Sequence, residues 1–586
     1  MIGSNYGYGW RTARPVGGPQ SALSGRPSLM SEELPRDENG NLIVPVGLGR
    51  RGFLVHAGVL GLSTMGLGAF LAACGKGEGN SEAAQIRKGG TLTFAIDGTN
   101  ALLDPAVYTT LGDWMAVDSI CGGLTNIDFT TTTPTPDLAS KIETSADGLT
   151  ITVTVRDGIE FHDGTAFTAH DIVRTFNRQL VDGDHSLPTA STRPMRGSVN
   201  RNIATVEALN DGTAQFTLKQ PDTVFTSRLT DISCRILSGA QMDKYGTALG
   251  QHLVGTGPFK LSSMTAQQSI TLAANTKYWK GAPVIDQLVL QQVTDPSSLV
   301  AGLQGEQINA SSFVAHSSAK ALAANPKVTV YNTPKHVDVF VMMNVTKPLL
   351  SDLRVRKAVN MCINRAKIAT DAFFGYAVAP DGYVISPGEV GYDSSLASLS
   401  TYDQAAAATL IEQAGATGKA VSLIAQNNNW YPATAQIIEA DLKAIGLVPT
   451  VELLDPGSYV GRFFDPTKHE LALWERDSYI PDPADSAGNM LGSTGSYANL
   501  GTGHAKLDPA TVGQIDTLLN QATQTTDPAT RKSLYSQAQR LFADKLMAVA
   551  MVVYTQNVVA SIGCTDIDAS ALGGSRMQMQ KAALTH

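Results

Sequence analysis

The chain has 586 residues, enough for roughly three or four domain-sized units, so a single small module is excluded. Apolar residues make up 43% of the chain and charged residues 16%, which excludes an intrinsically disordered chain and a polytopic membrane protein. The formal net charge is −8, and no run of Lys and Arg approaches the basic stripe of a nucleic-acid-binding protein. We therefore expect a multidomain globular protein with no nucleic-acid partner.

The first 73 residues indicate a signal or leader segment. Residues 1–48 show no helical or strand periodicity, and Arg50-Arg51 stands directly before an uncharged, Gly-rich run from Gly52 to Ala73. A charged region followed by an apolar region is typical of an export signal. The order Arg-Arg-x-Phe-Leu resembles a twin-arginine signal. A start at Met30 would keep the whole signal, so we assign no function to the residues before it.

A cysteine closes this run and predicts a lipid anchor. Leu71-Ala72-Ala73-Cys74 resembles a lipobox, in which the cysteine is diacylated, and residues 74–86 would then form the lipidated cysteine and its tether. Two acyl chains hold a protein stably on a membrane, whereas one binds only marginally. The alternative is an uncleaved membrane anchor over the same run. Either reading places the protein on the outer face of the cytoplasmic membrane or in the periplasm.

Periodicity predicts an α/β fold for the rest of the chain. Apolar residues alternate with polar ones from Leu92 to Ile96 and from Ile151 to Val155, which predicts strands, and Thr168 stands where a helix N-cap is expected. Short strands dominate between about 203 and 335, and helical patterns begin at Asp352. The later helices are expected at Val355 to Phe373, Asp403 to Ala414, Ala433 to Ile445, 512 to 525 and 528 to 545, with strands at Ala420 to Ala425, Thr450 to Leu454 and Ala548 to Ala560. This order predicts a strand-rich lobe followed by a mixed α/β lobe.

The chain shows no catalytic constellation, and we expect neither an enzyme nor a bound metal or cofactor. No P-loop, nucleophile elbow or zinc motif stands in a strand-turn-helix context. Gly255-Thr256-Gly257-Pro258 favours a turn over a phosphate cradle, and His162 and Asp163 favour a turn-capping role over half a metal site. The five cysteines have no ligand spacing, and pairing of Cys121 with Cys234 stays open.

Two polar-aromatic segments that follow predicted strands are the candidate ligand site. One contains Asn428, Asn429 and Trp430, and the other runs from Trp474 to Tyr479. Loops after strands carry the ligand sites of α/β sheets, where aromatic rings supply contact area and polar groups orient the ligand. The alternative for each aromatic residue is that it packs within its lobe. We expect the two loops together to bind a ligand.

The chain resembles the family 5 (cluster C) extracellular solute-binding proteins of ABC importers. The matching motifs run in family order over nearly the whole chain after the signal. They include Gly89-Gly90-Thr91-Leu92, Asp147-Gly148-Leu149-Thr150, the block from Phe161 to Ala169, Val254-Gly255-Thr256-Gly257-Pro258-Phe259, Asn275-Thr276-Lys277-Tyr278-Trp279, the block from Asp352 to Ala358, and Tyr479-Ile480-Pro481-Asp482-Pro483.

The resemblance implies a two-lobed periplasmic-binding-protein clamshell (type II) with an extra subdomain. By analogy, lobe I takes residues 87–122, 218–335 and 545–586, the subdomain within it takes 123–217, and lobe II takes 336–544. Hinge crossings are implied near 335 and 545. Preferential binding of the ligand to the closed form would drive closure.

The resemblance also implies a function. Trp474-x-x-Asp477 matches the Trp-x-x-Asp of peptide-binding relatives, whose aspartate binds the peptide amino terminus. Dipeptide-binding relatives carry arginines, one of which holds the ligand carboxylate, where this chain has Pro432 and Ala433. This difference weakens a dipeptide reading, and we expect an oligopeptide. We expect a monomeric, lipid-anchored receptor that hands its solute to an ABC permease complex. An oligosaccharide or other polar ligand, a peptide-signal receptor and, remotely, an exported hydrolase are the alternatives.

Overall fold

The computed structural model describes residues 87–107, 110–128, 133–180, 186–187, 200–387, 389–476, 480, 482–495, 497, 501–565, 567–569 and 577–585. All of them belong to the compact unit Glu82–His586. The predicted signal and anchor residues, Arg50, Arg51 and Cys74, lie outside the described residues. Within the ranges described, no helix has both the length and the apolar character that a membrane crossing requires.

One sheet of eleven strands joins residues from both halves of the chain. Its strands are ordered β15-β14-β16-β12-β17-β11-β1-β10-β9-β8, and β13 pairs with β17. The bounds are β15 Val448–Leu454, β14 Ala420–Gln426, β16 Leu471–Arg476, β12 Val328–Met343, β17 Val549–Ile562, β11 Ala310–Ser311, β1 Thr91–Ile96, β10 Gln287–Gln292, β9 Ser269–Ala274, β8 Phe259–Thr265 and β13 Ala377–Val378. The alternation in β1 has the predicted effect, because Leu92, Phe94 and Ile96 are fully buried.

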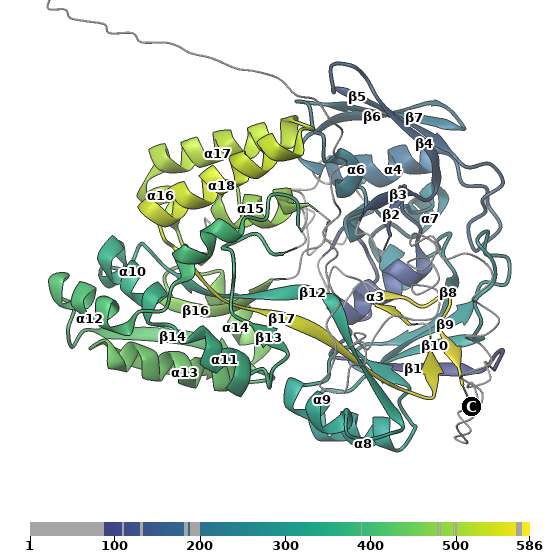
Figure 1. The fold of residues 1–586 in the computed structure, drawn as a ribbon. Helices are drawn as coiled ribbons and strands as arrows, with labels where there is room; N and C mark the ends of the chain where they lie inside the picture. The colour runs from purple at the N-terminus through teal and green to yellow at the C-terminus, as the bar shows by residue number, and fades with distance from the viewer. Residues whose placement is uncertain are drawn as a thin grey trace, which may run out of the picture. The chain divides into compact units, whose positions relative to one another are not determined.

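The long antiparallel strands β12 and β17 connect two hydrophobic cores (Figure 1). From Val339 onward β12 packs in one core, together with β17 up to Tyr554. Val328 at the other end of β12 packs in a second core with Ala560 and Ile562. The register of the pair shifts between Asn332 and His336. The sheet is therefore continuous while the cores on it are separate.

Helices surround the first of these cores, and several begin in the same way. They are α10 Leu353–Cys362, α11 Arg365–Asp371, α12 Gln404–Gln413, α13 Tyr431–Ala444, α14 Pro456–Phe463, α15 Pro483–Leu491, α16 His504–Leu507, α17 Pro509–Gln524 and α18 Pro528–Lys545. Helices α14, α15, α17 and α18 each start with an Asp-Pro pair, in which the aspartate accepts a backbone N–H of the first turn. Helix α8, Pro296–Gln304, starts likewise. Aspartate at the N-cap with proline at the first helical position is a strong start signal.

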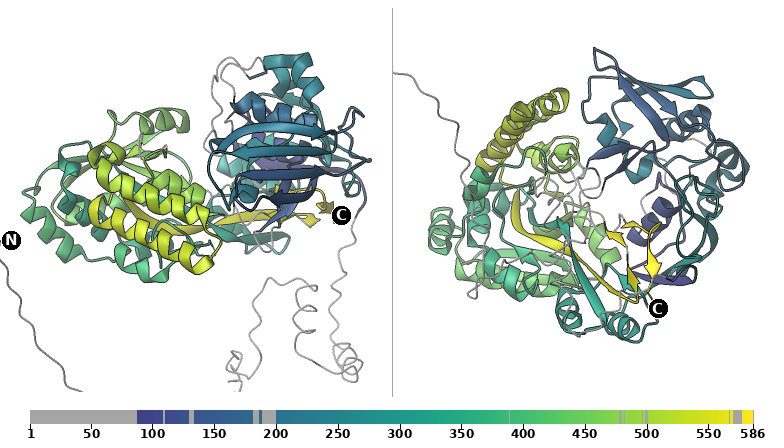
Figure 2. Two further views of the ribbon diagram at one scale, coloured as in Figure 1. Left: turned by 90° about the horizontal axis from the view of Figure 1, so that it is seen from above. Right: turned by 45° about the vertical axis from the view of Figure 1, so that its right-hand side comes forward.

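A second sheet of four antiparallel strands has a core of its own. Its order is β4-β5-β7-β6, with bounds β4 Ala139–Thr144, β5 Thr150–Val155, β7 Thr213–Leu218 and β6 Ile203–Asn210. Helix α4, Ala169–Leu180, packs against β6 and β7 (Figure 2). The rings of Phe176, Phe216 and Phe225 meet edge to face there, at centroid distances of 4.9 and 5.3 Å. Phe225 begins the short helix α6, Phe225–Arg228, which leads away from this sheet.

The remaining elements are short. The helices are α3 Leu111–Ile120, α7 Gly239–Tyr245 and α9 His316–Leu322. Two-stranded pairs form between β2 Thr125–Ile127 and β3 Pro134–Pro136, β18 Cys564–Thr565 and β21 Ala583–Leu584, and β19 Asp568–Ala569 and β20 Met577–Gln578. The prediction of an α/β fold is thus confirmed.

One predicted helix is wrong in its extent. The helix expected from Val355 to Phe373 is two helices, α10 and α11, because Ile363 between them is extended at φ −68° and ψ 117°. Asn364 then caps α11 by accepting the Lys367 N–H at 3.0 Å, while its own N–H donates to Asp441 at 2.8 Å. A tertiary contact with α13 therefore holds the break.

The two motifs with rival chemical interpretations are structural. Asp163 accepts the N–H and hydroxyl of Thr165 at 3.1 and 2.7 Å, which confirms its turn-capping role. A Cβ atom at Gly255 would lie 2.1 Å from the Ile120 carbonyl oxygen, so this turn packs tightly against the end of α3. Burial lowers the pKa of His162 to about 4, and its Nε2 lies 3.0 Å from the Gly257 carbonyl oxygen. Cys121 and Cys234 are buried free thiols.

Candidate ligand-binding site

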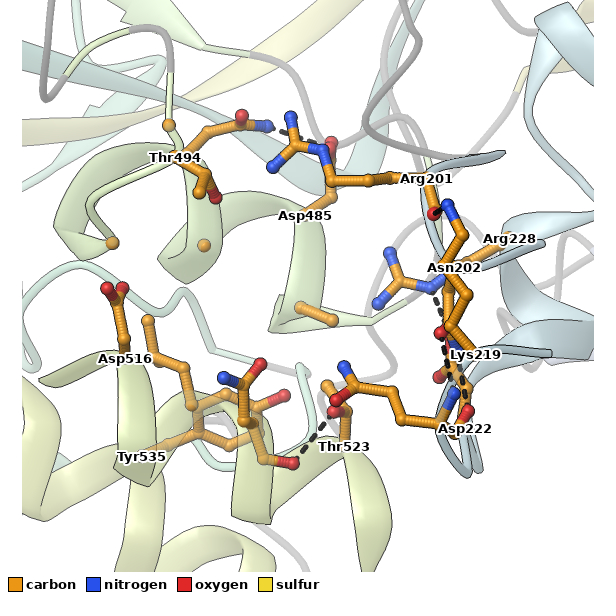
Figure 3. A pocket seen from close by; sticks show the side chains of 18 residues that line it. Arg201, Asn202, Lys219, Asp222, Arg228, Asp485, Thr494, Asp516, Thr523 and Tyr535 are labelled. Carbon is orange, nitrogen blue, oxygen red and sulfur yellow. Dashed lines mark hydrogen bonds and ion pairs between the residues drawn. The ribbon is translucent and has the colours of Figure 1, made fainter. Parts of the chain in front are cut away.

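A pocket of about 380 Å³ lies between the second sheet and the helices α15, α17 and α18 (Figure 3). We call its two sides the sheet wall and the helix wall. The sheet wall is Arg201, Asn202, Lys219, Gln220, Asp222 and Arg228. The helix wall is Ala484, Asp485, Gly488, Asn489, Gly492, Thr494, Gly495, Asp516, Leu519, Asn520, Thr523 and Tyr535. The two walls belong to parts of the chain with separate hydrophobic cores.

Most of the sheet wall is fixed by hydrogen bonds close to β7. Arg228 donates to Asp222 at 2.8 Å, and the Asp222 carboxylate also accepts the Val224 N–H at 3.1 Å. Burial lowers the pKa of Arg228, but Asp222, with Asp482 and Asp485 at the start of α15, raises it by more. Arg228 thus remains charged and is attracted to carboxylates on the far side of the pocket.

The helix wall carries two carboxylates that accept hydrogen bonds from neighbouring residues. Asp485 accepts the Asn489 side-chain N–H at 2.9 Å, one turn further along α15. Asp516 on α17 accepts the Ser493 N–H at 2.9 Å. These bonds fix both carboxylates at the pocket, where they can accept donors from a ligand.

A buried ion pair ties α15 to α18 behind this wall. The second nitrogen of the Arg531 fork donates to both oxygens of Asp482, at 3.0 and 2.8 Å, and Arg531 Nε donates to the Ala522 carbonyl at the end of α17. Burial raises the pKa of Asp482, and the Arg531 charge acts against that rise. Asp482 also caps α15 by accepting the Ala484 N–H at 2.9 Å. One aspartate therefore starts α15 and positions it against its neighbours.

The predicted aromatic residues pack in the core beside β14 and β16. Trp430 is 7% exposed and stacks on Tyr431 at a centroid distance of 3.8 Å. Trp474 stacks on Phe463 at 4.0 Å, and its indole N–H has no hydrogen-bond partner among the described residues. Tyr459 lies between the two groups, 6.1 Å from Tyr431 and 5.9 Å from Trp474. One chain of rings therefore connects both predicted loops.

The predicted polar residues lie apart from these rings. Asn428 and Asn429 are exposed, and Asn429 has a positive φ of 51°. Asp477 and Tyr479 lie outside the described residues. Of the predicted site residues that the structure describes, none lines the pocket between the sheet and helix walls. Their roles in binding stay predictions.

Sequence reasoning missed a buried ion pair next to the Trp474 motif. Arg476, the last residue of β16, pairs with Asp338 on β12, and both side chains are almost fully buried. Asp338 also accepts the Ser386 hydroxyl at 2.5 Å. Burial lowers the pKa of Arg476, but Asp338 raises it by more, so the guanidinium stays charged. Its Nε and Nη1 atoms have no hydrogen-bond partner in the described part of the chain.

Comparison with known proteins identifies the family. The family model for bacterial extracellular solute-binding proteins, family 5 (middle), matches residues 133–498, which is more than half of the chain. The chain belongs to this family.

No group of three or more His, Cys, Asp or Glu side chains that could hold a metal ion occurs among the residues described.

Relatives of this solute-binding protein are themselves binding proteins. Glutathione-binding protein GsiB of Shigella dysenteriae is 28% identical over 432 residues, which cover 71% of this chain and 80% of that protein. GsiB of Escherichia coli strain K12 gives the same identity and coverage. Both relatives are named as glutathione-binding proteins.

Solved structures show the fold. DppA of Helicobacter pylori, an ABC transporter-associated periplasmic binding protein in complex with the peptide STSA, matches with a TM-score of 0.76 and 24% identity, covering 85% of this chain and 99% of DppA. AppA of Bacillus subtilis, in complex with a nonapeptide, matches with a TM-score of 0.72 and 20% identity, covering 85% and 100%. AgaA of A. tumefaciens R10, in complex with agropinic acid, matches with 0.74 and 22%, covering 85% and 99%. The predicted periplasmic-binding-protein fold is confirmed.

Proposed function

We propose that this protein is a lipid-anchored receptor that captures an oligopeptide outside the cytoplasm and delivers it to an ABC importer. The observation that carries the proposal is the pocket between the sheet and helix walls, whose sides belong to separate hydrophobic cores. A ligand held between two such parts stabilises the arrangement in which both contact it. A capture protein needs this coupling, because the importer must distinguish loaded from empty receptor.

A peptide is the proposed solute because of the ligands named for the relatives and because the Asp477 carboxylate could bind a peptide amine. GsiB proteins are named for glutathione, and DppA and AppA were solved with peptides. We assign the peptide amine to Asp477, and contacts to Trp474, Trp430, Asn428, Asn429 and Tyr479. A charge-assisted hydrogen bond to a buried carboxylate contributes about 1.5–3 kcal/mol, or roughly 10- to 100-fold in affinity.

The proposed place of action follows from the N-terminal segment. Arg50 and Arg51 would direct export, and diacylated Cys74 with the tether up to residue 86 would hold the protein on the membrane. The lobe boundaries proposed above put the tether at the start of lobe I. The protein would then act as a monomer beside its permease.

Native mass spectrometry of residues 75–586, purified without denaturation, tests the proposal. A retained peptide, lost on Asp477→Asn and kept on Asp211→Asn, would support a peptide receptor with Asp477 as its amine anchor. Asp211 is the matched control because its side chain is 85% exposed and lies outside the pocket. A retained sugar or metal chelate whose binding is unchanged by Asp477→Asn would agree with a solute receptor. It would contradict the proposal that the solute is a peptide.

A further inference from the structure

A second pocket, of about 310 Å³, lies beside helix α3, and we call it the α3 pocket. One wall contains Asp118, Asn126, Asp137, Arg235, Tyr278 and Lys280, and residues 579–581 near the C-terminus form another. None of these residues lines the pocket between the sheet and helix walls. Ligand pockets occupy about 300–1,000 Å³, so the α3 pocket has room for a small molecule.

Two ion pairs place charges of both signs at the α3 pocket. Arg235 donates to one oxygen of Asp118, through Nε at 2.7 Å and through Nη2 at 2.5 Å. Lys280 pairs with Asp137, and its ammonium also lies 4.7 Å from the centre of the Trp279 ring. Arg235 and Asp137 are 1% and 4% exposed, so water does little to screen their charges. The opposite charges of these pairs balance each other.

Several hydrogen-bonding groups at the α3 pocket are unused. The Tyr278 hydroxyl and the Asn126 side-chain N–H group form no hydrogen bond with a described residue. The Asn126 amide is oriented by its oxygen, which accepts the Ile127 N–H at 2.9 Å. One oxygen of Asp137 accepts from Lys280, and no described residue donates to the other. The pocket therefore offers both donors and an acceptor to a ligand.

The wall near the C-terminus adds a further acceptor and apolar surface. Gln580 Nε2 donates to the carbonyls of Lys280 and Gly281, at 3.2 and 3.0 Å, and its Oε1 accepts no hydrogen bond from a described residue. Met579, which is 2% exposed, supplies the apolar surface. Lys581 completes this wall, and because it is exposed, water screens its charge.

This mixture of groups matches the hydroxyl groups of a sugar. A hydroxyl group donates one hydrogen bond and accepts others, so it can bridge an amide or ammonium donor and a carboxylate acceptor. An anion in the pocket would meet the carboxylates of Asp118 and Asp137. A cation would meet Arg235 and Lys280. A neutral ligand avoids both repulsions, and the apolar C–H face of a sugar ring can pack on Met579.

We propose that the α3 pocket binds a neutral sugar of the hexose class, free or as the end residue of a glycan, through hydrogen bonds to Tyr278, Asn126 and Asp137. This site is separate from the solute site of the proposed function and does not depend on it. The protein then holds two different ligands in two different pockets.

Ligand-observed NMR titration of the full chain tests the proposal. The sugar probes are glucose, galactose, mannose and N-acetylglucosamine, with cellotetraose as a glycan. Acetate and phosphate are the anionic comparisons. We expect at least one of the four monosaccharides to bind, and both anions to bind at least tenfold more weakly than that sugar.

Two variants remove one unused donor each. Tyr278→Phe removes only the hydroxyl, and Asn126→Asp replaces the amide N–H group while keeping the oxygen that accepts the Ile127 N–H. Each should raise the Kd of the sugar roughly two- to tenfold. The thermal unfolding of Tyr278→Phe should match that of the wild type, because its hydroxyl bonds no described residue. Tyr402→Phe is the matched control, since Tyr402 is 45% exposed and lines neither pocket.

Three results would overturn the proposal. They are binding of none of the four monosaccharides, a Kd that neither Tyr278→Phe nor Asn126→Asp changes, and tighter binding of acetate or phosphate than of any sugar. Cellotetraose separates the two sources of the ligand. A site for a glycan end binds it as well as glucose, whereas a site for a free sugar excludes it. Failure of the proposal leaves the receptor function standing, because no residue of the α3 pocket takes part in it.

Discussion

The backbone N–H of Thr223 donates to the carbonyl of Thr523 at 2.8 Å, although 300 residues separate them. The Thr223 hydroxyl donates to the same carbonyl at 2.9 Å and lies 3.3 Å from the carbonyl of Thr525. These carbonyls stand at the end of α17, where a helix leaves its last C=O groups without partners. A loop of the sheet wall thus completes a helix of the helix wall at the edge of the pocket.

Thr223→Val should weaken ligand binding. The substitution keeps the side-chain shape and removes the hydroxyl donor, while the backbone bond to Thr523 remains. A net loss of about 0.5–1.5 kcal/mol per hydrogen bond corresponds to roughly a two- to tenfold rise in Kd. Calorimetry with the retained solute would measure it.

Thr223→Ser is the matched control, because it keeps the hydroxyl and should bind as the wild type does. The thermal unfolding of both variants should stay close to that of the wild type, since Thr223 is exposed. Unchanged affinity in Thr223→Val would mean that this contact does not contribute to the ligand-bound arrangement.

Removing one partner of the Asp338–Arg476 pair should lower the free energy of unfolding. Asp338→Asn leaves the buried Arg476 guanidinium without its counter-charge, and removing one partner of a buried pair costs about 3–5 kcal/mol of unfolding free energy. Urea denaturation would measure the loss. The double variant Asp338→Asn with Arg476→Met should lose less than the sum of the two single variants. Additive losses would show that the two side chains do not stabilise each other.

Much of the fold follows from local signals in the sequence. Period-2 alternation located β1 and β5, and helical periodicity located α12, α13, α17 and α18 to within a few residues. The Asp-Pro pairs at 295, 455 and 482 are a further local signal, and each starts a helix. The break at Ile363 had no comparable signal, because the contact between Asn364 and Asp441 of α13 holds it.

The pocket could not be predicted in the same way. Arg201, Lys219, Asp485 and Asp516 come from four separate segments, and no spacing in the sequence relates them. The aromatic loops were predictable because their residues are neighbours in sequence. Arg476 stood inside the quoted motif, but only the pairing of β16 with β12 brings it to Asp338. Groups of residues that are neighbours in sequence could therefore be predicted. Groups that only strand pairing or helix packing brings together could not.

Cys74→Ala should release the protein from the membrane. Without the cysteine no lipid can be attached, and the protein should move from the membrane fraction to the soluble exported fraction. Immunoblotting of fractionated cells would show the shift. Replacing Arg50 and Arg51 together by lysine should instead retain the precursor inside the cell. A Cys74→Ala protein that stays in the membrane would favour an uncleaved anchor.

His504 should make the protein less stable as the pH falls below neutrality. Its Nδ1 lies 2.6 Å from the Thr502 hydroxyl, its Nε2 lies 3.3 Å from the Leu491 carbonyl, and burial lowers its pKa to about 4. The charge of nearby Arg356 acts in the same direction. In the unfolded chain a histidine titrates near pH 6.5, so between about pH 6.5 and 4 the unfolded state binds the extra proton. The stability contributed by neutral His504 is complete above this window and is lost as the pH falls through it.

Comparison of urea unfolding at pH 8 and pH 5 would measure this loss. From the two pKa values, His504 should account for about 2 kcal/mol of the decline in unfolding free energy, and His504→Gln should decline by that much less. Asp97 acts in the opposite direction, because burial raises its pKa to about 6 and its folded form gains protons in the same range. That contribution is common to both proteins and cancels in their difference. His170→Gln, at an exposed histidine, should keep the wild-type decline. Equal declines in His504→Gln and the wild type would show that His504 takes up its proton without unfolding the protein.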